Sequence, residues 1–230
     1  TTEACLHYYE NKKRLPNGLM EEVQANLKSV EEKTGKKFGN PQNPLFLSVR
    51  SGSAISMPGM MDTVLNLGLN DQTLEGLIQI TSDGRFAYDA YRRFIQLFGK
   101  IALEADEKEF DQILTKTKEK VGVTEDTDLN ADHLKDICKQ YLTLIKKRAG
   151  TSFPQDPMAQ LRLAIEAVFK SWMGKRAVAY RKEFNITPEM ANGTAVNVCT
   201  MVFGNMGLDS ATGVAFTRDP GTGENTLYGE

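Results

Sequence analysis

The sequence predicts an α/β fold of the α+β type with a mostly helical subdomain inserted into it. Helix-like patterns open the chain, short apolar strands follow, and helical periodicity then dominates up to about residue 190. From residue 194 the pattern changes to the β-branched kind that is typical of strands. We therefore expect an α/β lobe formed by residues 1–70 and 190–230, and a helical subdomain formed by residues 71–189.

Two helices are expected first, over residues 2–11 and about 17–34. In the second helix, apolar residues recur at helical spacing up to Gly35, a residue type that commonly ends helices. The apolar run over residues 44–50 predicts a short buried strand. Residues 64–69 alternate well enough to form another strand.

Amphipathic helices are expected throughout the middle of the chain. Asp106 and Glu109 resemble a capping box at the start of one helix, and Asn130 begins another. Asp156 followed by Pro157 is a cap with proline at the first helical position. The apolar stripes that we expect to be buried are Ala87, Tyr91, Phe94, Phe98 and Ile101, then Leu134, Ile137, Tyr141, Leu144 and Ile145, and then Leu161, Ile165, Val168 and Trp172.

Strands and turns are expected at the end of the chain. Residues 194–203 are rich in β-branched and apolar types, and residues 204–207 supply the glycines of a turn. Residues 213–217 are expected to return as the second strand of a hairpin. Because the chain begins without methionine and ends without a closing helix, we expect it to be a segment of a longer polypeptide.

The most informative segment is the loop that follows the first predicted strand. Arg50 stands at its entrance, and residues 51–59 are mostly small and include Gly52 and Gly59. Small side chains let backbone N–H groups approach an anion closely, and glycine supplies positive φ angles. A buried arginine is costly unless it meets an anion, and its guanidinium offers a planar fork of donors to phosphate oxygens. The segment predicts a phosphate-binding loop, and the alternatives are an ordinary surface turn or a structural ion pair of Arg50.

Composition excludes several classes of protein. The net charge is -2, which gives no electrostatic footprint for nucleic acid. No apolar run approaches the ~20 residues of a membrane span. Cys5, Cys138 and Cys199 are odd in number and far apart, which suits small buried positions in a reducing compartment. We expect a cytoplasmic protein, and the sequence leaves a plastid or another organelle open.

Residues 56–63 read Ser-Met-Pro-Gly-Met-Met-Asp-Thr, and they follow Val-Arg-Ser-Gly at residues 49–52. Together with residues 65–71, these stretches resemble the ATP-grasp-type nucleotide-binding domain of the pyruvate, phosphate dikinase family. Related phosphoenolpyruvate synthases carry a different loop after their arginine. The resemblance covers the whole chain and is weakest over about 105–190. Its further matches lie at residues 1–5, 86–89, 91–94, 194–198, 200–205 and 212–220.

The resemblance implies that several residues bind ATP. Arg50 would be the catalytic residue, set against the ATP phosphates, where it would stabilise charge that develops during phosphoryl transfer. Arg93 would contribute to the same site, whereas Arg92 would be solvated or paired with Asp89. The other implied residues are Gly59, Met60 and Met61 in the loop over the nucleotide, Thr200, Met201 and Val202 beside the adenine, and Thr212 and Gly213 at the phosphates. Without the resemblance, a methionine-rich core plug, a strand core and a hairpin turn would explain these three groups.

Other parts of the family's site are expected elsewhere. The phosphate-carrying histidine of the family lies in a separate swivelling domain, and neither His7 nor His133 resembles it. Magnesium-binding carboxylates, a glutamine and a phosphate-binding lysine are expected outside this segment, so no metal ligand is assigned here. Residues 124–128 are acidic but lack the glycine and the closing glutamate of a calcium loop, which favours a solvated connection.

The function that the resemblance implies is the ATP-binding step of a pyruvate, phosphate dikinase. ATP and inorganic phosphate would phosphorylate the distant histidine and release AMP and pyrophosphate. The histidine domain would then convert pyruvate to phosphoenolpyruvate, with Mg²⁺ required, in a homodimer formed through a C-terminal domain. The segment alone is expected to be inactive. The alternatives are a related dikinase, of the phosphoenolpyruvate synthase or glucan/water type, and a non-catalytic nucleotide-sensing or docking module that exposes the apolar stripe of residues 131–148 or 158–172.

Overall fold

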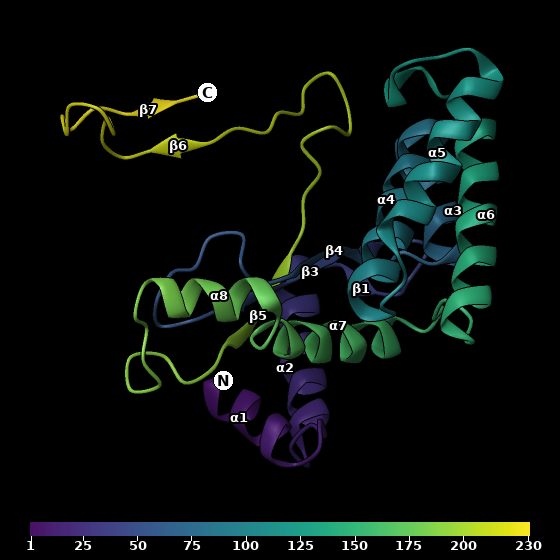
Figure 1. Ribbon diagram of the computed structural model, residues 1–230. Coiled ribbons are helices and arrows are strands. Elements are labelled where there is room, and N and C mark those ends of the chain that lie inside the picture. Colours follow the sequence, from purple (N-terminus) through teal and green to yellow (C-terminus); the bar gives the residue numbers. More distant parts are fainter.

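The structure is a computed structural model that describes residues 1–230 (Figure 1). It mixes helices with three small sheets, which confirms the α+β class. None of the helices has the length and apolar character needed to cross a membrane. The helices are α1 (Thr2–Glu10), α2 (Leu19–Thr34), α3 (Asp71–Thr81), α4 (Gly84–Ala102), α5 (Glu107–Val121), the 3₁₀ turn η1 (Asp126–Asp128), α6 (Ala131–Ala149), α7 (Pro157–Ser171) and α8 (Lys175–Glu183). The strands are β1 (Lys37–Phe38), β2 (Pro44–Leu45), β3 (Leu47–Gly52), β4 (Thr63–Leu67), β5 (Ala195–Thr200), β6 (Ala215–Phe216) and β7 (Tyr228–Gly229).

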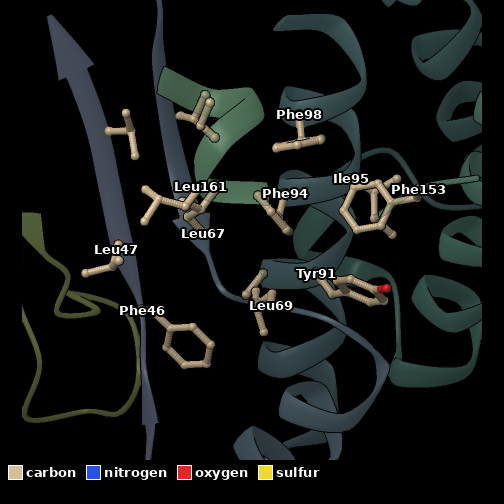
Figure 2. Close-up of a cluster of buried hydrophobic side chains, with 14 of the residues drawn as sticks. Phe46, Leu47, Leu67, Leu69, Tyr91, Phe94, Ile95, Phe98, Phe153 and Leu161 are labelled. Atoms are coloured by element: carbon tan, nitrogen blue, oxygen red, sulfur yellow. The ribbon is translucent and has the colours of Figure 1, made fainter. Parts of the chain in front are cut away.

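The main sheet has β3 at its centre, with β4 and β5 antiparallel on either side. Val49 of β3 lies opposite Val64 of β4 in the register, and both are fully buried. Helix α7 packs against all three strands, and its Leu161 lies beside Leu47 on the face that Val49 shares (Figure 2). Because side chains alternate along a strand, Arg50 must point to the opposite face. The sheet is therefore covered on one face and bears Arg50 on the other.

One hydrophobic core joins this sheet to the helices. Phe94 and Phe98 of α4 are fully buried, and both meet Phe153 edge-on, with ring centroids 5.5 and 5.4 Å apart. Figure 2 shows this aromatic group facing Leu67, the last residue of β4. The expected apolar stripes are buried, apart from two members that are only partly buried, Ile101 and Leu144.

The helix limits expected from local sequence signals are confirmed. Gly35 ends α2 in the left-handed conformation, with φ of 64°. The side chain of Asn130 caps α6, and that of Asp156 caps α7, whose first residue is Pro157. Each signal acts within one turn of helix, so it does not depend on the rest of the fold.

Gln160 ties α7 to the end of β4. Its side chain is fully buried, and its amide donates to the carbonyl oxygens of Leu69, at 2.9 Å, and Pro154, at 2.8 Å. Its own side-chain oxygen accepts a hydrogen bond from the Gly68 N–H at 3.0 Å. A buried amide needs such partners, so these three bonds fix the position of α7 under the sheet.

The capping box expected at Asp106 and Glu109 is wrong. Asp106 does cap α5, through the Lys108 N–H. Glu109 does not return to the cap, because its carboxylate pairs with Arg148 of α6. An ion pair between two helices has thus replaced a local hydrogen bond.

The hairpin expected between residues 194–203 and 213–217 is also wrong. Strand β5 ends at Thr200, and β6 pairs with β7 rather than with β5. The reason is the turn after β6, in which the Asp219 carboxylate accepts hydrogen bonds from two backbone N–H groups just beyond it and bends the chain back. Figure 1 shows the β6–β7 pair extending away from the main sheet.

The acidic residues 124–128 are exposed apart from half-buried Asp126, which confirms the expected solvated connection, and the segment is also fixed to α4. Arg85 of α4 donates three hydrogen bonds to backbone carbonyl oxygens in and just after this segment. The Asp126 carboxylate pairs with Lys118 at 2.9 Å and with Arg92 at 3.4 Å. Helix α4 presents two arginines here, and they anchor the segment.

Candidate functional site

Arg50 lies in the middle of the main sheet, on its uncovered face. It stands opposite Thr63 of β4 and Asn197 of β5. The expectation that Arg50 is buried is wrong: it is exposed, because no helix covers this face of β3. Its guanidinium makes no hydrogen bond or ion pair within the chain, so the alternative of a structural ion pair is wrong as well. Arg50 is a free cation on a rigid strand.

The loop after β3 forms a pocket of about 430 Å³ together with this arginine, which we call the Arg50 pocket. Its walls are Arg50, residues 51–59, Met61 and Thr63. Met57 is buried and anchors the loop to the core, and Gly59 has φ of 71°, which favours glycine. The Oγ of Ser53 is buried without a hydrogen-bond partner. An anion in this pocket would meet a cation, a hydroxyl and glycine backbone.

A second pocket, of about 470 Å³, lies between α4 and the segment that follows β5, and we call it the Arg93 pocket. Arg93 and Asp89 of α4 form its charged part. Its other walls are mostly apolar, which is usual for a pocket that holds a ring system. The remaining lining residues are Leu65, Asn66, Phe86, Ala90, Phe94, Leu97, Met201, Val202, Phe203, Gly204, Asn205 and Thr212.

The two pockets adjoin each other on one face of the sheet. Thr63 lines the Arg50 pocket and Leu65 lines the Arg93 pocket. These two residues of β4 are two positions apart, so they share a face and lie roughly 6–7 Å from each other along the strand. The face that bears Arg50 therefore continues directly into the apolar walls around Arg93.

Met201 is fixed at the junction of the sheet and the Arg93 pocket. Its N–H donates to the Phe46 carbonyl oxygen at 2.9 Å, and its sulfur accepts a hydrogen bond from the Asn66 N–H at 3.1 Å. Phe203, two residues on, packs edge-on against Phe86 of α4 with ring centroids 5.1 Å apart. The segment after β5 is thus held against α4, although it lies outside the strand.

The structure divides the residues that the sequence assigned to one site. Arg50, Gly59 and Met61 line the Arg50 pocket, and Arg93, Met201, Val202 and Thr212 line the Arg93 pocket. Three further residues line neither pocket. Met60 packs against the core, Thr200 is exposed at the end of β5, and Gly213 lies against the backbone of Glu230.

Thr212 reaches the Arg93 pocket through a close approach of two turns. A Cβ built on Gly204 would lie 1.6 Å from the Thr212 Oγ1, so only glycine fits at that position. The turn of small residues at 210–213 is thereby brought beside the turn at residues 204–207. Thr212, which the resemblance assigns to the phosphates, therefore lines the same pocket as Met201, which it assigns to the adenine.

The arginines of α4 differ sharply. Arg92 is buried and pairs with Asp89, so the expected pairing is confirmed and the solvated alternative is wrong. Burial alone would lower the pKa of the Arg92 guanidinium, but the charge and hydrogen bonds of Asp89 outweigh burial and raise that pKa above its usual value. Arg93 is mostly exposed and also bonds Asp89.

The family model described as "Pyruvate phosphate dikinase, AMP/ATP-binding domain" matches residues 11–229. The chain belongs to this family. Along its whole length, it is 57% identical to pyruvate, phosphate dikinase of Entamoeba histolytica, 52% identical to that of Giardia intestinalis and 52% identical to a chloroplastic one of Arabidopsis thaliana. The chain spans only 26%, 26% and 24% of these relatives, about a quarter of their length.

As an AMP/ATP-binding domain, the chain has one pocket residue and one neighbour of Arg50 that the sequence did not assign to the site. Asn66 has φ of 61° and lines the Arg93 pocket; its position two residues before Gly68 in a strand was the available signal. Asn197 lies beside Arg50, and its amide nitrogen would be 2.6 Å from a Cβ at Gly52. Its polar side chain in an otherwise apolar strand was the signal there.

The domain holds no group of three or more histidine, cysteine or acidic side chains placed to bind a metal ion. Residues of this chain therefore do not by themselves fit a magnesium site.

Proposed function

We propose that this chain is the ATP-binding part of a pyruvate, phosphate dikinase with an ATP-grasp-like fold and a helical insert. In the complete reaction, ATP and inorganic phosphate phosphorylate a histidine on a separate swivelling domain of the same polypeptide, and AMP and pyrophosphate leave. The phosphohistidine then serves the interconversion of pyruvate and phosphoenolpyruvate. The names of the relatives and the matched AMP/ATP-binding domain support this proposal.

The observation that carries the proposal is the free guanidinium of Arg50 in a pocket of small residues that adjoins an apolar pocket. An exposed arginine without an internal partner is available to an anion, and a rigid strand limits the entropy lost on binding. A nucleotide is polar at its phosphates and flat and apolar at its base. The Arg50 pocket suits the first part and the Arg93 pocket suits the second.

We assign roles on this basis. Arg50 is the catalytic residue: it binds phosphate oxygens and stabilises the charge that develops as the phosphoryl group leaves. Gly59 and Met61 shape the loop beside it, and Met201 and Val202 border the adenine. Arg93 and Thr212 contact the polar part of the nucleotide from the second pocket. For Met60, Thr200 and Gly213 the same roles stay predictions, since none of the three lines a pocket.

Several parts of the proposal lie beyond these residues. Because no cluster of ligands fits Mg²⁺, we assign no step to a metal ion and expect its ligands in another part of the polypeptide. Dimer formation, a cytoplasmic location and the absence of nucleic-acid or membrane partners stay predictions; some relatives are chloroplastic. The placement of the domain boundaries near residues 70 and 190 also stays a prediction.

The structure contradicts the feature on which the alternative of a non-catalytic docking module depended. That alternative needed an exposed apolar stripe on α6 or α7. Leu134, Tyr141 and Ile145 of α6 are fully buried, and so are Leu161 and Val168 of α7. The relatives named above favour the pyruvate, phosphate enzyme over a related dikinase with another acceptor.

The test compares the ATP affinity of the unchanged chain with that of Arg50→Ala. Both affinities are measured by NMR titration up to millimolar ATP. Charge-assisted hydrogen bonds are worth about 1.5–3 kcal/mol, so the substitution should weaken binding roughly tenfold to a hundredfold. Arg162→Ala is the matched control, because Arg162 is an exposed arginine of α7 whose partner is Glu166. It should leave ATP affinity unchanged. Equal affinity of Arg50→Ala and the unchanged chain would refute the role of Arg50.

A further inference from the structure

Asp89 of α4 is a buried carboxylate that serves two arginines at once. Its Oδ1 accepts hydrogen bonds from Arg92 Nε at 3.1 Å and Nη2 at 2.7 Å, and its Oδ2 accepts one from Arg93 Nε at 2.8 Å. The side chains of Asp89 and Arg92 are 8% and 4% exposed, whereas that of Arg93 is 63% exposed. One oxygen of Asp89 thus faces the interior and the other serves the rim of the Arg93 pocket.

Arg93 is held by one edge of its guanidinium only. Its Nε is bonded to Asp89, and its two terminal nitrogens have no partner within the chain. Both Asp89 and Arg93 line the Arg93 pocket. A guanidinium fixed through Nε keeps its plane and direction, and it leaves the terminal N–H groups as a fork for an anion.

The charges around Asp89 leave the charge of Arg93 uncompensated. Arg92 also reaches Asp126 Oδ2 at 3.4 Å, and Lys118 pairs with Asp126 Oδ1 at 2.9 Å. Three cations therefore face two carboxylates, so the group carries one net positive charge. Arg93 is the most exposed of the three cations, and the surplus charge is available there.

We propose that Asp89 is a positioning residue that aims Arg93 at the anionic part of a bound nucleotide. Buried Arg92 neutralises the charge of Asp89, so Asp89 orients Arg93 without cancelling the positive charge of Arg93. The inference rests on the proposed function, which it deepens. Asp126 of η1, which itself pairs with Lys118 of α5, also binds Arg92 and so connects the helical part of the chain to the pocket.

A purely structural role for Asp89 would require only its hydrogen bonds with Arg92, not the additional bond with Arg93. The pair of Asp89 Oδ1 with Arg92 already satisfies a buried arginine at two of its nitrogens. The bond from Oδ2 to an exposed arginine adds little stability, since exposed ion pairs contribute at most about 1 kcal/mol. Its consequence is the direction of the Arg93 side chain.

The test is a double-mutant cycle on ATP affinity with Asp89→Asn, Arg93→Ala and both together. Asp89→Asn should weaken ATP binding about tenfold in the unchanged chain and less than twofold in the Arg93→Ala background, because it acts through Arg93. Equal losses in both backgrounds would overturn the proposal, since a general structural defect acts whether or not Arg93 is present. Asp136→Asn, which removes a carboxylate of α6 that pairs with no cation, is the matched control and should leave affinity unchanged.

Arg93→Lys keeps the test decisive if Asp89→Asn fails to fold. Lysine retains the positive charge, but it has a single terminal nitrogen. It therefore cannot bond Asp89 through one nitrogen and offer two others to an anion. The proposal expects Arg93→Lys to lose nearly as much affinity as Arg93→Ala, and full affinity of Arg93→Lys would overturn it.

The NMR signal of the Arg93 Nε–H separates this inference from the proposed function. In the unchanged chain without nucleotide, that proton should exchange more slowly with water than the Nε–H of exposed Arg14, whose side chain makes no hydrogen bond, because Asp89 holds it. Rapid exchange together with normal ATP binding would overturn the role of Asp89 alone. Loss of all ATP binding in the unchanged chain would instead overturn the proposed function and this inference with it.

Discussion

Gly76 of α3 approaches the backbone of Pro41 so closely that a Cβ at position 76 would lie 1.8 Å from the Pro41 carbonyl oxygen. Glycine inside a helix costs about 0.5–1 kcal/mol relative to alanine, so helix propensity alone disfavours it here. The contact explains its presence. It lets α3 pack against the segment that leads into β2, and β2 is followed directly by β3, which bears Arg50.

Gly76→Ala should therefore destabilise the chain although alanine is the better helix former. Overpacking against backbone that cannot yield costs typically about 1–3 kcal/mol. The measurement is the free energy of unfolding in urea. Gly84→Ala is the control, because a Cβ there would make an ordinary 3.7 Å contact with the Ala131 Cβ. That variant should be as stable as the unchanged chain or up to about 1 kcal/mol more stable. Similar stability of both variants would show that the close approach is absent.

Phe94→Ala should be among the most destabilising single changes in the chain. Phe94 is fully buried and packs against Phe98 and Phe153 at the centre of the core (Figure 2). Removing a buried phenylalanine side chain costs about 3–5 kcal/mol. Leu208→Ala, at a fully exposed position, should change stability by less than about 0.5 kcal/mol. A loss below about 1 kcal/mol for Phe94→Ala in urea unfolding would contradict this packing.

Local signals account for the parts of the fold that the sequence predicts well. Gly35, Asn130 and Asp156 act within one helical turn, so their effects do not depend on tertiary structure. The pairing of β6 could not be foreseen, because it depends on the turn at Asp219 and on a two-residue strand too short for any periodic pattern. The ion pair of Glu109 with Arg148 on another helix could not be foreseen either, because it depends on how the two helices pack.

For the site, the sequence predicts the residue types better than their surroundings. The small-residue loop beside Arg50 is readable from composition, because such loops need glycine and short side chains. The exposure of Arg50 is not readable, since it depends on which face of the sheet α7 covers. The second partner of Arg92, Asp126, comes from a different element, and no local pattern reports that pairing.

Arg181→Met should change the fluorescence of Trp172, the one tryptophan of the chain. The Arg181 guanidinium lies 3.9 Å from the indole ring centre, and its Nη1 donates to the Trp172 carbonyl oxygen at 2.8 Å. Removing it exposes the buried ring and deletes a cation–π contact of about 0.5–2 kcal/mol. We expect a red shift of the emission maximum. Lys175→Met, on the same helix, is the control, and an unshifted spectrum in Arg181→Met would refute the contact.

The stability that Asp126 provides should depend on pH. Burial alone would raise the pKa of its carboxyl, but the hydrogen bond from Lys118 and the charge of Arg92 outweigh burial and lower that pKa. A group with a lowered folded-state pKa stabilises the protein above its unfolded pKa, about 4 for aspartate, and loses this effect as the pH falls through the folded value. Asp126→Asn should therefore destabilise the chain at pH 7, by up to about 1 kcal/mol because the pair is partly exposed.

The difference in free energy of unfolding between Asp126→Asn and the unchanged chain should shrink as the pH falls from 5 toward 3. At low pH the Asp126 carboxyl is protonated and uncharged, like the amide of asparagine. Urea unfolding at several pH values measures it. Asp136→Asn should differ from the unchanged chain by less than about 0.5 kcal/mol at every pH, because Asp136 pairs with no cation. The destabilisation by Asp126→Asn could instead be constant between pH 7 and pH 3. That result would show that the residue acts through its shape rather than its charge, and it would refute a stabilising role of the ion pairs with Lys118 and Arg92.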